Sequence, residues 1–188
     1  MGNRAGMQFR IHGNTYFYFV LLLFLVPLPW LFAWLVAVAI HEFFHYAAVR
    51  LCGGSVNSLS VGIGGANMSC SNLTEGKSLC AILAGPIFGL LPSFLGSWFP
   101  RLAVCCWVLT VYNLLPLLPL DGGRALQILL KDNKCFYIIQ RIALVLLAGI
   151  SVYSAFVLRI GALPLAIVVG LWLKIRKRPC NDSVCKVQ

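Results

Sequence analysis

Residues 30–51 read WLFAWLVAVAIHEFFHYAAVRL, an apolar run with two histidines and one glutamate in its second half. A transmembrane helix needs about 20 mostly apolar residues to cross the hydrocarbon core of a bilayer, so the length of this run predicts a membrane-spanning helix. Ionisable side chains inside such a span are costly and are functional-site candidates by default. The stretch therefore predicts both a membrane fold and the place of its chemistry.

The composition of the whole chain supports the same class. Of its 188 residues, 60% are hydrophobic and 11% are charged, with a mean hydropathy of +0.88. Average soluble domains have about 45–50% apolar and about 25% charged residues. Five acidic and fifteen basic residues cannot cover a globular surface with charge, which excludes an ordinary soluble enzyme. We predict an all-α, multi-pass integral membrane protein.

Six transmembrane helices fit the apolar runs, and together they form one integral-membrane domain over residues 1–188. With both termini cytoplasmic, thirteen of the fifteen Lys and Arg residues lie on the cytoplasmic side, and Arg101 and Arg159 are the exceptions. This asymmetry is the positive-inside bias. The net charge of +10 is therefore interpreted as topology and contact with the lipid bilayer, not as nucleic-acid binding. The expected spans lie near residues 14–28, 30–51, 79–99, 102–119, 136–157 and 160–174.

The polar residues of the second span have the spacing of a metal site. His41 and His45 are four residues apart, so a helix places both imidazoles on one face, where they can bind a single Zn²⁺. Glu42 lies beside them and can accept a proton from a metal-activated water molecule. The alternative is a structural polar cluster that packs helices together.

Two histidines and a water leave a tetrahedral zinc site one protein ligand short. Asp121 is the best candidate, since it follows a long apolar run that Pro116 and Pro119 break at membrane depth. We expect Gly122 and Gly123 to allow a sharp turn that aims the carboxylate inward. The alternative is that Asp121 only caps the following helix.

These motifs together resemble the site-2 protease family of intramembrane zinc metalloproteases. The resemblance rests on His41-Glu42-x-x-His45, on the run from Asn113 to Arg124 (NLLPLLPLDGGR), and on the short segment Ala84-Gly85-Pro86. The nearest fit is the bacterial branch that includes the sporulation sigma-factor-processing protease. The resemblance covers roughly residues 10–175.

The resemblance implies a zinc endopeptidase of the bacterial cell membrane. His41, His45 and Asp121 would be the zinc ligands, Glu42 the general acid/base, and Asn113 a donor to the scissile carbonyl. For Asn113, an interhelical hydrogen bond is the alternative. The implied substrate is a single-span or membrane-associated regulator, such as a sigma-factor precursor or an anti-sigma factor. We expect neither a PDZ nor a CBS domain.

Residues 52–78 are rich in glycine and short apolar residues, which favours extended backbone over helix. We expect a membrane-associated β-hairpin whose exposed edge could capture an unwound substrate by strand addition. A plain connecting loop is the alternative.

Two other functions compete with proteolysis. A transporter of ions or protons could use the buried His, Glu and Asp, although it would more often show an internal repeat with matching broken helices. A catalytically inactive binding protein of the same fold is the second alternative, yet no expected ligand is missing. The sequence leaves the oligomeric state and the roles of His12, Cys180 and Cys185 open.

Overall fold

The computed structural model describes residues 8–11, 26–62, 65–131, 133–156 and 168–173. The chain divides into two compact units, with the boundary between Tyr112 and Asn113.

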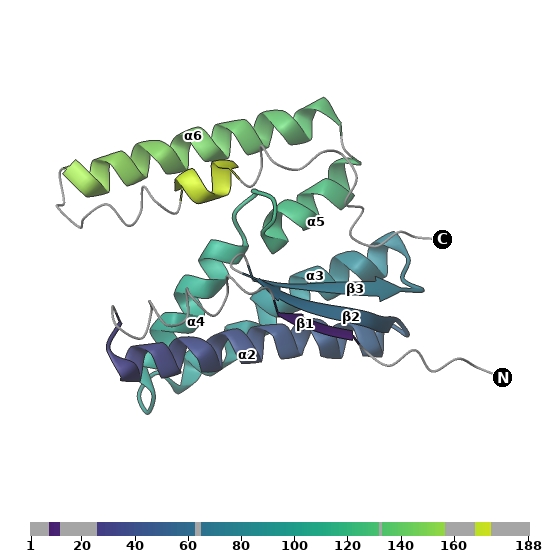
Figure 1. The fold of residues 1–188 in the computed structure, drawn as a ribbon, viewed down its shortest axis with the longest axis horizontal. Coiled ribbons are helices and arrows are strands. Elements are labelled where there is room, and N and C mark those ends of the chain that lie inside the picture. The colour runs from purple at the N-terminus through teal and green to yellow at the C-terminus, as the bar shows by residue number, and fades with distance from the viewer. Residues whose placement is uncertain (1–7, 12–25, 63–64, 132, 157–167, 174–188) are drawn as a thin grey trace. The chain divides into compact units, whose positions relative to one another are not determined.

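The first unit is built on helices α2, α3 and α4 (Figure 1). Helix α2 spans Leu28–Leu51, with Pro27 at its N-cap and Pro29 in its first turn, where the missing N–H of proline is not needed. Helix α3 spans Glu75–Gly89 and is followed by the short 3-10 helix η1 at Leu91–Leu95. Helix α4 spans Pro100–Asn113.

Two apolar clusters hold α2 in this unit. One joins α2 to α4 through four small side chains and one leucine, namely Ala33, Ala37, Cys105, Cys106 and Leu109. The other joins the end of α2 to the start of α3 and consists of Val49, Leu73 and Ala81. Small residues at these contacts let helix backbones approach closely, as in membrane helix packing.

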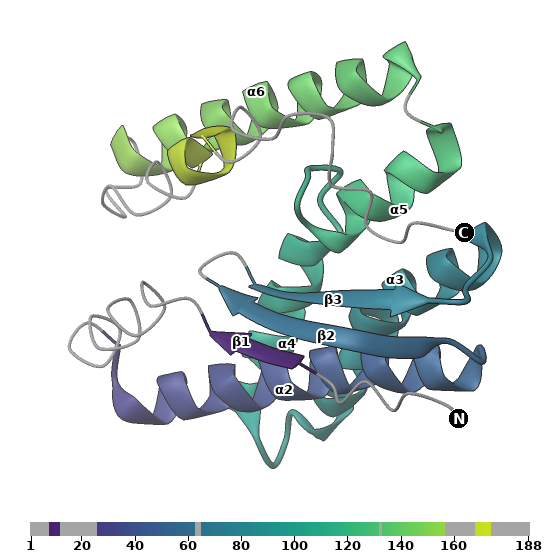
Figure 2. The ribbon, with the colours of Figure 1, turned by 45° about the vertical axis from the view of Figure 1, so that its right-hand side comes forward.

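A three-stranded sheet lies alongside α2 (Figure 2). Strands β2 (Ser55–Gly62) and β3 (Gly65–Ser71) form the expected antiparallel hairpin, so the extended interpretation is confirmed for these strands. It is wrong for residues 75–78, which begin α3. The sequence did not predict β1 (Gln8–Ile11), which pairs with β2 in parallel. Gly53, at φ +81°, takes the chain from α2 into β2 in a conformation that favours glycine.

The second unit contains α5 (Asp121–Leu130) and α6 (Lys134–Phe156), which contact each other. Here the expected fourth span, 102–119, needs correction, because α4 ends at Asn113 and an irregular segment follows. Pro116 lacks the N–H that a continuing helix would require. Helix α5 is not among the six expected spans and was expected only in the alternative in which Asp121 caps a following helix. It ends at Lys131, whose left-handed backbone (φ 47°) terminates the helix.

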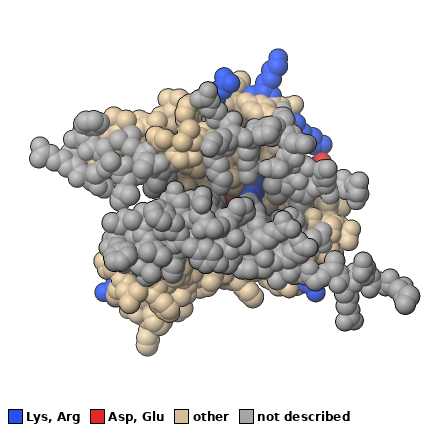
Figure 3. Space-filling view, viewed as in Figure 1, with Lys and Arg blue, Asp and Glu red and all other residues tan. Residues whose placement is uncertain are grey.

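Among the described residues, three helices are long and apolar enough to cross a membrane: Leu28–Leu51, Glu75–Leu95 and Lys134–Ser154. Between 17% and 39% of each apolar window is buried inside the protein, so most of this apolar surface faces outward. On the face in Figure 3 the described surface is largely uncharged, with Lys and Arg in a few small groups. These are features of a helical membrane protein. The expected spans at 14–28 and 160–174 lie largely outside the described residues.

Candidate metal centre

The two histidines of α2 face each other. His41 and His45 lie one helical turn apart, and their Nε2 atoms are 3.1 Å from each other. Their rings meet edge to face, with centroids 4.7 Å apart and an interplanar angle of 84°. The side chain of His41 is buried at 3% exposure and that of His45 is half-buried. The helical spacing therefore brings two imidazole nitrogens to one point, as the sequence predicts.

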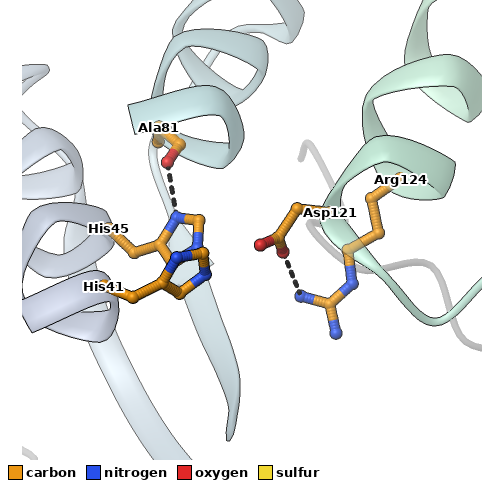
Figure 4. Close-up of polar contacts among 5 residues, drawn as sticks. All are labelled: His41, His45, Ala81, Asp121 and Arg124. Atoms are coloured by element: carbon orange, nitrogen blue, oxygen red, sulfur yellow. Dashed lines mark hydrogen bonds and ion pairs between the residues drawn. The ribbon is translucent and has the colours of Figure 1, made fainter. Parts of the chain in front are cut away.

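A backbone group of α3 holds the His45 ring. Nδ1 of His45 lies 2.8 Å from the carbonyl oxygen of Ala81 (Figure 4). A carbonyl oxygen can only accept a hydrogen bond, so Nδ1 carries the proton and donates it. In the neutral ring, the lone pair is then on Nε2, which accepts a hydrogen bond from Nε2 of His41 in this structure. A neutral ring with its lone pair on one nitrogen is the form of histidine that binds metals. Metal-binding histidines commonly donate their second N–H to such a partner.

The histidine pair fits a zinc ion. Zinc binds imidazole nitrogen at about 2.0–2.1 Å in a tetrahedral arrangement, which separates two nitrogen ligands by about 3.3 Å. The observed separation of 3.1 Å between the two Nε2 atoms is close to that value. Both the identity of the donor atoms and their spacing agree with a shared ion.

Glycine residues of α3 lie against both imidazoles. A Cβ added to Gly85 would overlap the Nε2 and Cε1 atoms of His45. A Cβ added to Gly89 would lie 3.4 Å from Nδ1 of His41, an ordinary contact. The rings thus occupy space that a side chain on α3 would otherwise fill.

Helix α4 supports α3 through a hydrogen bond next to Gly85. Pro86 lies inside α3, one residue after Gly85, and its carbonyl oxygen accepts a buried hydrogen bond of 3.3 Å from the Thr110 hydroxyl. The backbone N–H of Leu90, the partner that a regular helix would supply, bonds the carbonyl of Phe88 instead. Thr110 thereby satisfies a carbonyl group that the end of α3 leaves available.

Glu42 follows His41 on α2 and is half-buried. One residue corresponds to about 100° of helical rotation, so Glu42 leaves α2 beside the face that the two histidines share.

The third candidate ligand, Asp121, is the first residue of α5 and is buried at 7% exposure. Its Oδ1 lies 3.9 Å from a guanidinium nitrogen of Arg124, three residues along the helix (Figure 4). The carboxylate also lies in the first turn, where the helix dipole stabilises negative charge. Leu120, whose side chain makes no capping hydrogen bond, occupies the N-cap position, and Asp121 follows it as the first helical residue.

Gly122 and Gly123 act differently from the expectation. Both belong to α5 and make no turn. A Cβ on Gly122 would overlap the carbonyl oxygen of Leu114, and one on Gly123 would overlap the carbonyl group of Leu117. The glycines are therefore needed because the irregular segment passes directly over the start of α5.

Asn113 is the last residue of α4 and is half-buried.

Sequence reasoning missed Ala81 and Thr110 and gave Gly85 no structural role. The spacing Ala81-x-x-x-Gly85-x-x-x-Gly89 was the available signal, because small residues four apart mark a helix face open to close approach.

Comparison with known proteins finds a solved structure of the same fold. The chain is similar to the solved structure of the site-2 protease from Methanocaldococcus jannaschii, with a TM-score of 0.66 and 15% sequence identity over 99% of this chain and 98% of that chain. At this identity the likeness establishes the fold. No protein-family model matches the sequence, and no curated protein matches it.

Proposed function

We propose that this protein is an intramembrane zinc metalloendopeptidase that cleaves a peptide bond in or near the transmembrane segment of a membrane-tethered regulator. The observation that carries the proposal is the imidazole pair of His41 and His45, whose Nε2 atoms lie 3.1 Å apart in an apolar helix. The site-2 protease fold supports it. The resemblance of the motifs to the bacterial branch favours a substrate such as a sigma-factor precursor or an anti-sigma factor.

The zinc ligands in this proposal are His41, His45 and Asp121. Two imidazoles and a carboxylate form a donor set that can hold a metal ion, and catalytic zinc sites use three such protein ligands. When bound there, zinc would supply Lewis-acid chemistry, which makes water more nucleophilic near neutral pH and polarises a carbonyl group. Arg124, three residues further along α5, would hold the Asp121 side chain in place through their ion pair.

Glu42 is the general acid and base of the proposed reaction. Its carboxylate accepts a proton from the attacking water and delivers it to the leaving amine as the C–N bond breaks. Asn113 would donate its amide N–H to the carbonyl oxygen, where negative charge develops in the transition state.

The position of the histidines along α2 indicates where cleavage would fall. At about 1.5 Å per residue, His41 and His45 lie about 20 and about 26 Å from Leu28, in a helix about 36 Å long. With Arg50 at the cytoplasmic end, as the charge asymmetry predicts, the site lies in the cytoplasmic half of the bilayer. We propose that cleavage falls near that end of the substrate's span and releases a cytoplasmic product.

We also propose that the sheet receives the substrate. A protease requires an extended substrate, and an edge strand can supply backbone hydrogen bonds to an added strand. Among the described residues, β3 pairs with β2 alone, so one edge of β3 has no strand partner.

The experiment that tests the function is co-expression of the wild type or Glu42→Gln with candidate single-span regulators. Glu42→Gln keeps the size of the side chain and removes the proton-accepting carboxylate. We expect the wild type to release a fragment and Glu42→Gln to release little or none, because general acid–base catalysis typically contributes about 10²–10⁴-fold in rate.

Equal release of the same fragment by both proteins would overturn the assignment of this protein as a hydrolase. A transporter or an inactive binding protein of this fold would release no fragment from any regulator in either form. Measurement of zinc content in both proteins serves as the control, since the loss of activity should occur with the metal retained.

A further inference from the structure

Two histidine rings of α2 lie against small residues of α3. Ala81, Gly85 and Gly89 lie four residues apart on α3, and all three are buried. Ala81 offers its carbonyl oxygen to His45, and Gly85 and Gly89 lie against the two imidazoles. Each of these three contacts involves a histidine that we propose as a zinc ligand.

We infer that Gly85, together with the Ala81 carbonyl group, is a positioning element that fixes the His45 ring in its metal-binding orientation. The inference rests on the proposed metal-dependent function. The Ala81 oxygen holds the proton on Nδ1, which leaves the Nε2 lone pair for the metal. Gly85 keeps clear the space that the Nε2 edge of the ring occupies.

A substitution at Gly85 should change the position of the His45 ring without changing the stability of the fold. The atoms that a Cβ at Gly85 would meet are Nε2, Cε1 and Cδ2 of His45, all in a side chain that can rotate away. Rotation would break the 2.8 Å hydrogen bond to Ala81 and move Nε2 from its place beside His41, while the helices keep their packing. Gly85→Ala should therefore weaken metal binding and leave the fold in place.

Helix α3 offers matched controls for this substitution. An added Cβ at Gly76 meets nothing within 4 Å, so Gly76→Ala introduces the same methyl group on the same helix without a contact. Gly89→Ala is intermediate, because its Cβ would make an ordinary contact with His41. The three glycines form a graded series toward the proposed metal site.

The test is zinc affinity of the full chain purified in detergent, measured by competition with a chelator, with thermal unfolding of the metal-free protein alongside. We expect Gly85→Ala to bind zinc about 10–100-fold more weakly, as for loss of other groups that orient metal ligands. Gly89→Ala should lose a few-fold at most and Gly76→Ala nothing. The visible spectrum of bound Co²⁺ should change in Gly85→Ala alone. Equal zinc affinity in Gly85→Ala and Gly76→Ala would overturn the inference.

A second measurement uses the unmodified protein and does not depend on any variant folding. The ¹⁵N chemical shifts of labelled histidine in the metal-free chain, assigned with His45→Ala, should show His45 protonated on Nδ1 and bare on Nε2. The opposite tautomer would refute the role of the Ala81 carbonyl. A wild-type chain that binds no zinc would instead defeat the proposed function, and the tautomer would still decide the orientation of the ring.

Discussion

The two regions that supply the proposed ligands both use glycine for close approach, but they approach different kinds of atom. In the α2–α3 pair, Gly85 lies against the imidazole of His45, a side chain that can move. At the start of α5, Gly122 and Gly123 lie against carbonyl groups of the backbone at Leu114 and Leu117. A substitution in the first region displaces a ligand, whereas one in the second must move the chain itself. The same residue type therefore protects function in one region and the fold in the other.

The largest expected effect comes from removing a ligand from either region. His45→Ala and Asp121→Ala should each abolish stoichiometric zinc and proteolysis, because a catalytic site with two remaining protein ligands holds the metal poorly. Metal analysis of the purified variants is the measurement. Full zinc content in Asp121→Ala would show that the second region supplies no zinc ligand. Only the α2–α3 pair would then belong to the metal site.

Asn113→Ala tests whether the junction between the two regions takes part in the chemistry. Loss of one donor to a developing oxyanion typically costs about 10²–10³ in rate, so cleavage should slow by that factor with zinc retained. Single-turnover cleavage and metal content are measured on the same preparation. A variant that cleaves as fast as the wild type would remove Asn113 from the mechanism, and one that fails to fold would make the residue structural.

Gly122→Ala and Gly123→Ala address the fold of the second region. A methyl group pressed into backbone atoms causes overpacking, which typically costs about 1–3 kcal/mol of stability. Thermal unfolding in detergent should show this loss for both variants. Gly149→Ala in α6 is the matched control, since its Cβ meets nothing within 4 Å and alanine favours a helix. Unfolding midpoints as high as that of the control would contradict the close approach of residues 114–118.

The smallest effect on stability is expected from the hydrogen bond between α4 and α3 in the first region. Thr110→Val removes the hydroxyl that bonds the Pro86 carbonyl and should cost about 0.5–1.5 kcal/mol in stability. Thr110→Ser keeps the hydroxyl and controls for the change at the side chain. If Thr110→Val is as stable as Thr110→Ser, the hydrogen bond between α4 and α3 contributes little.

The sequence by itself determined the membrane class and the pairing of His41 with His45. Composition decides the first, because a chain with so few charged residues cannot cover a soluble surface. Helical periodicity decides the second, since residues four apart share a face whatever surrounds the helix. The assignments of Asp121, inferred from the segment that Pro116 and Pro119 break, and of Asn113, implied by motif resemblance, stay predictions.

Tertiary structure decided the groups that hold those side chains in place. The Ala81 carbonyl that orients His45 lies 36 residues away in the chain, and β1 pairs with a strand about 50 residues later. Every residue has a carbonyl oxygen, so no pattern of residue types marks the one that meets an imidazole. The turn expected at Gly122 and Gly123 was wrong for the same reason. A glycine in a sequence shows where the chain tolerates a turn or a close contact, and only the packed fold shows which of the two it makes.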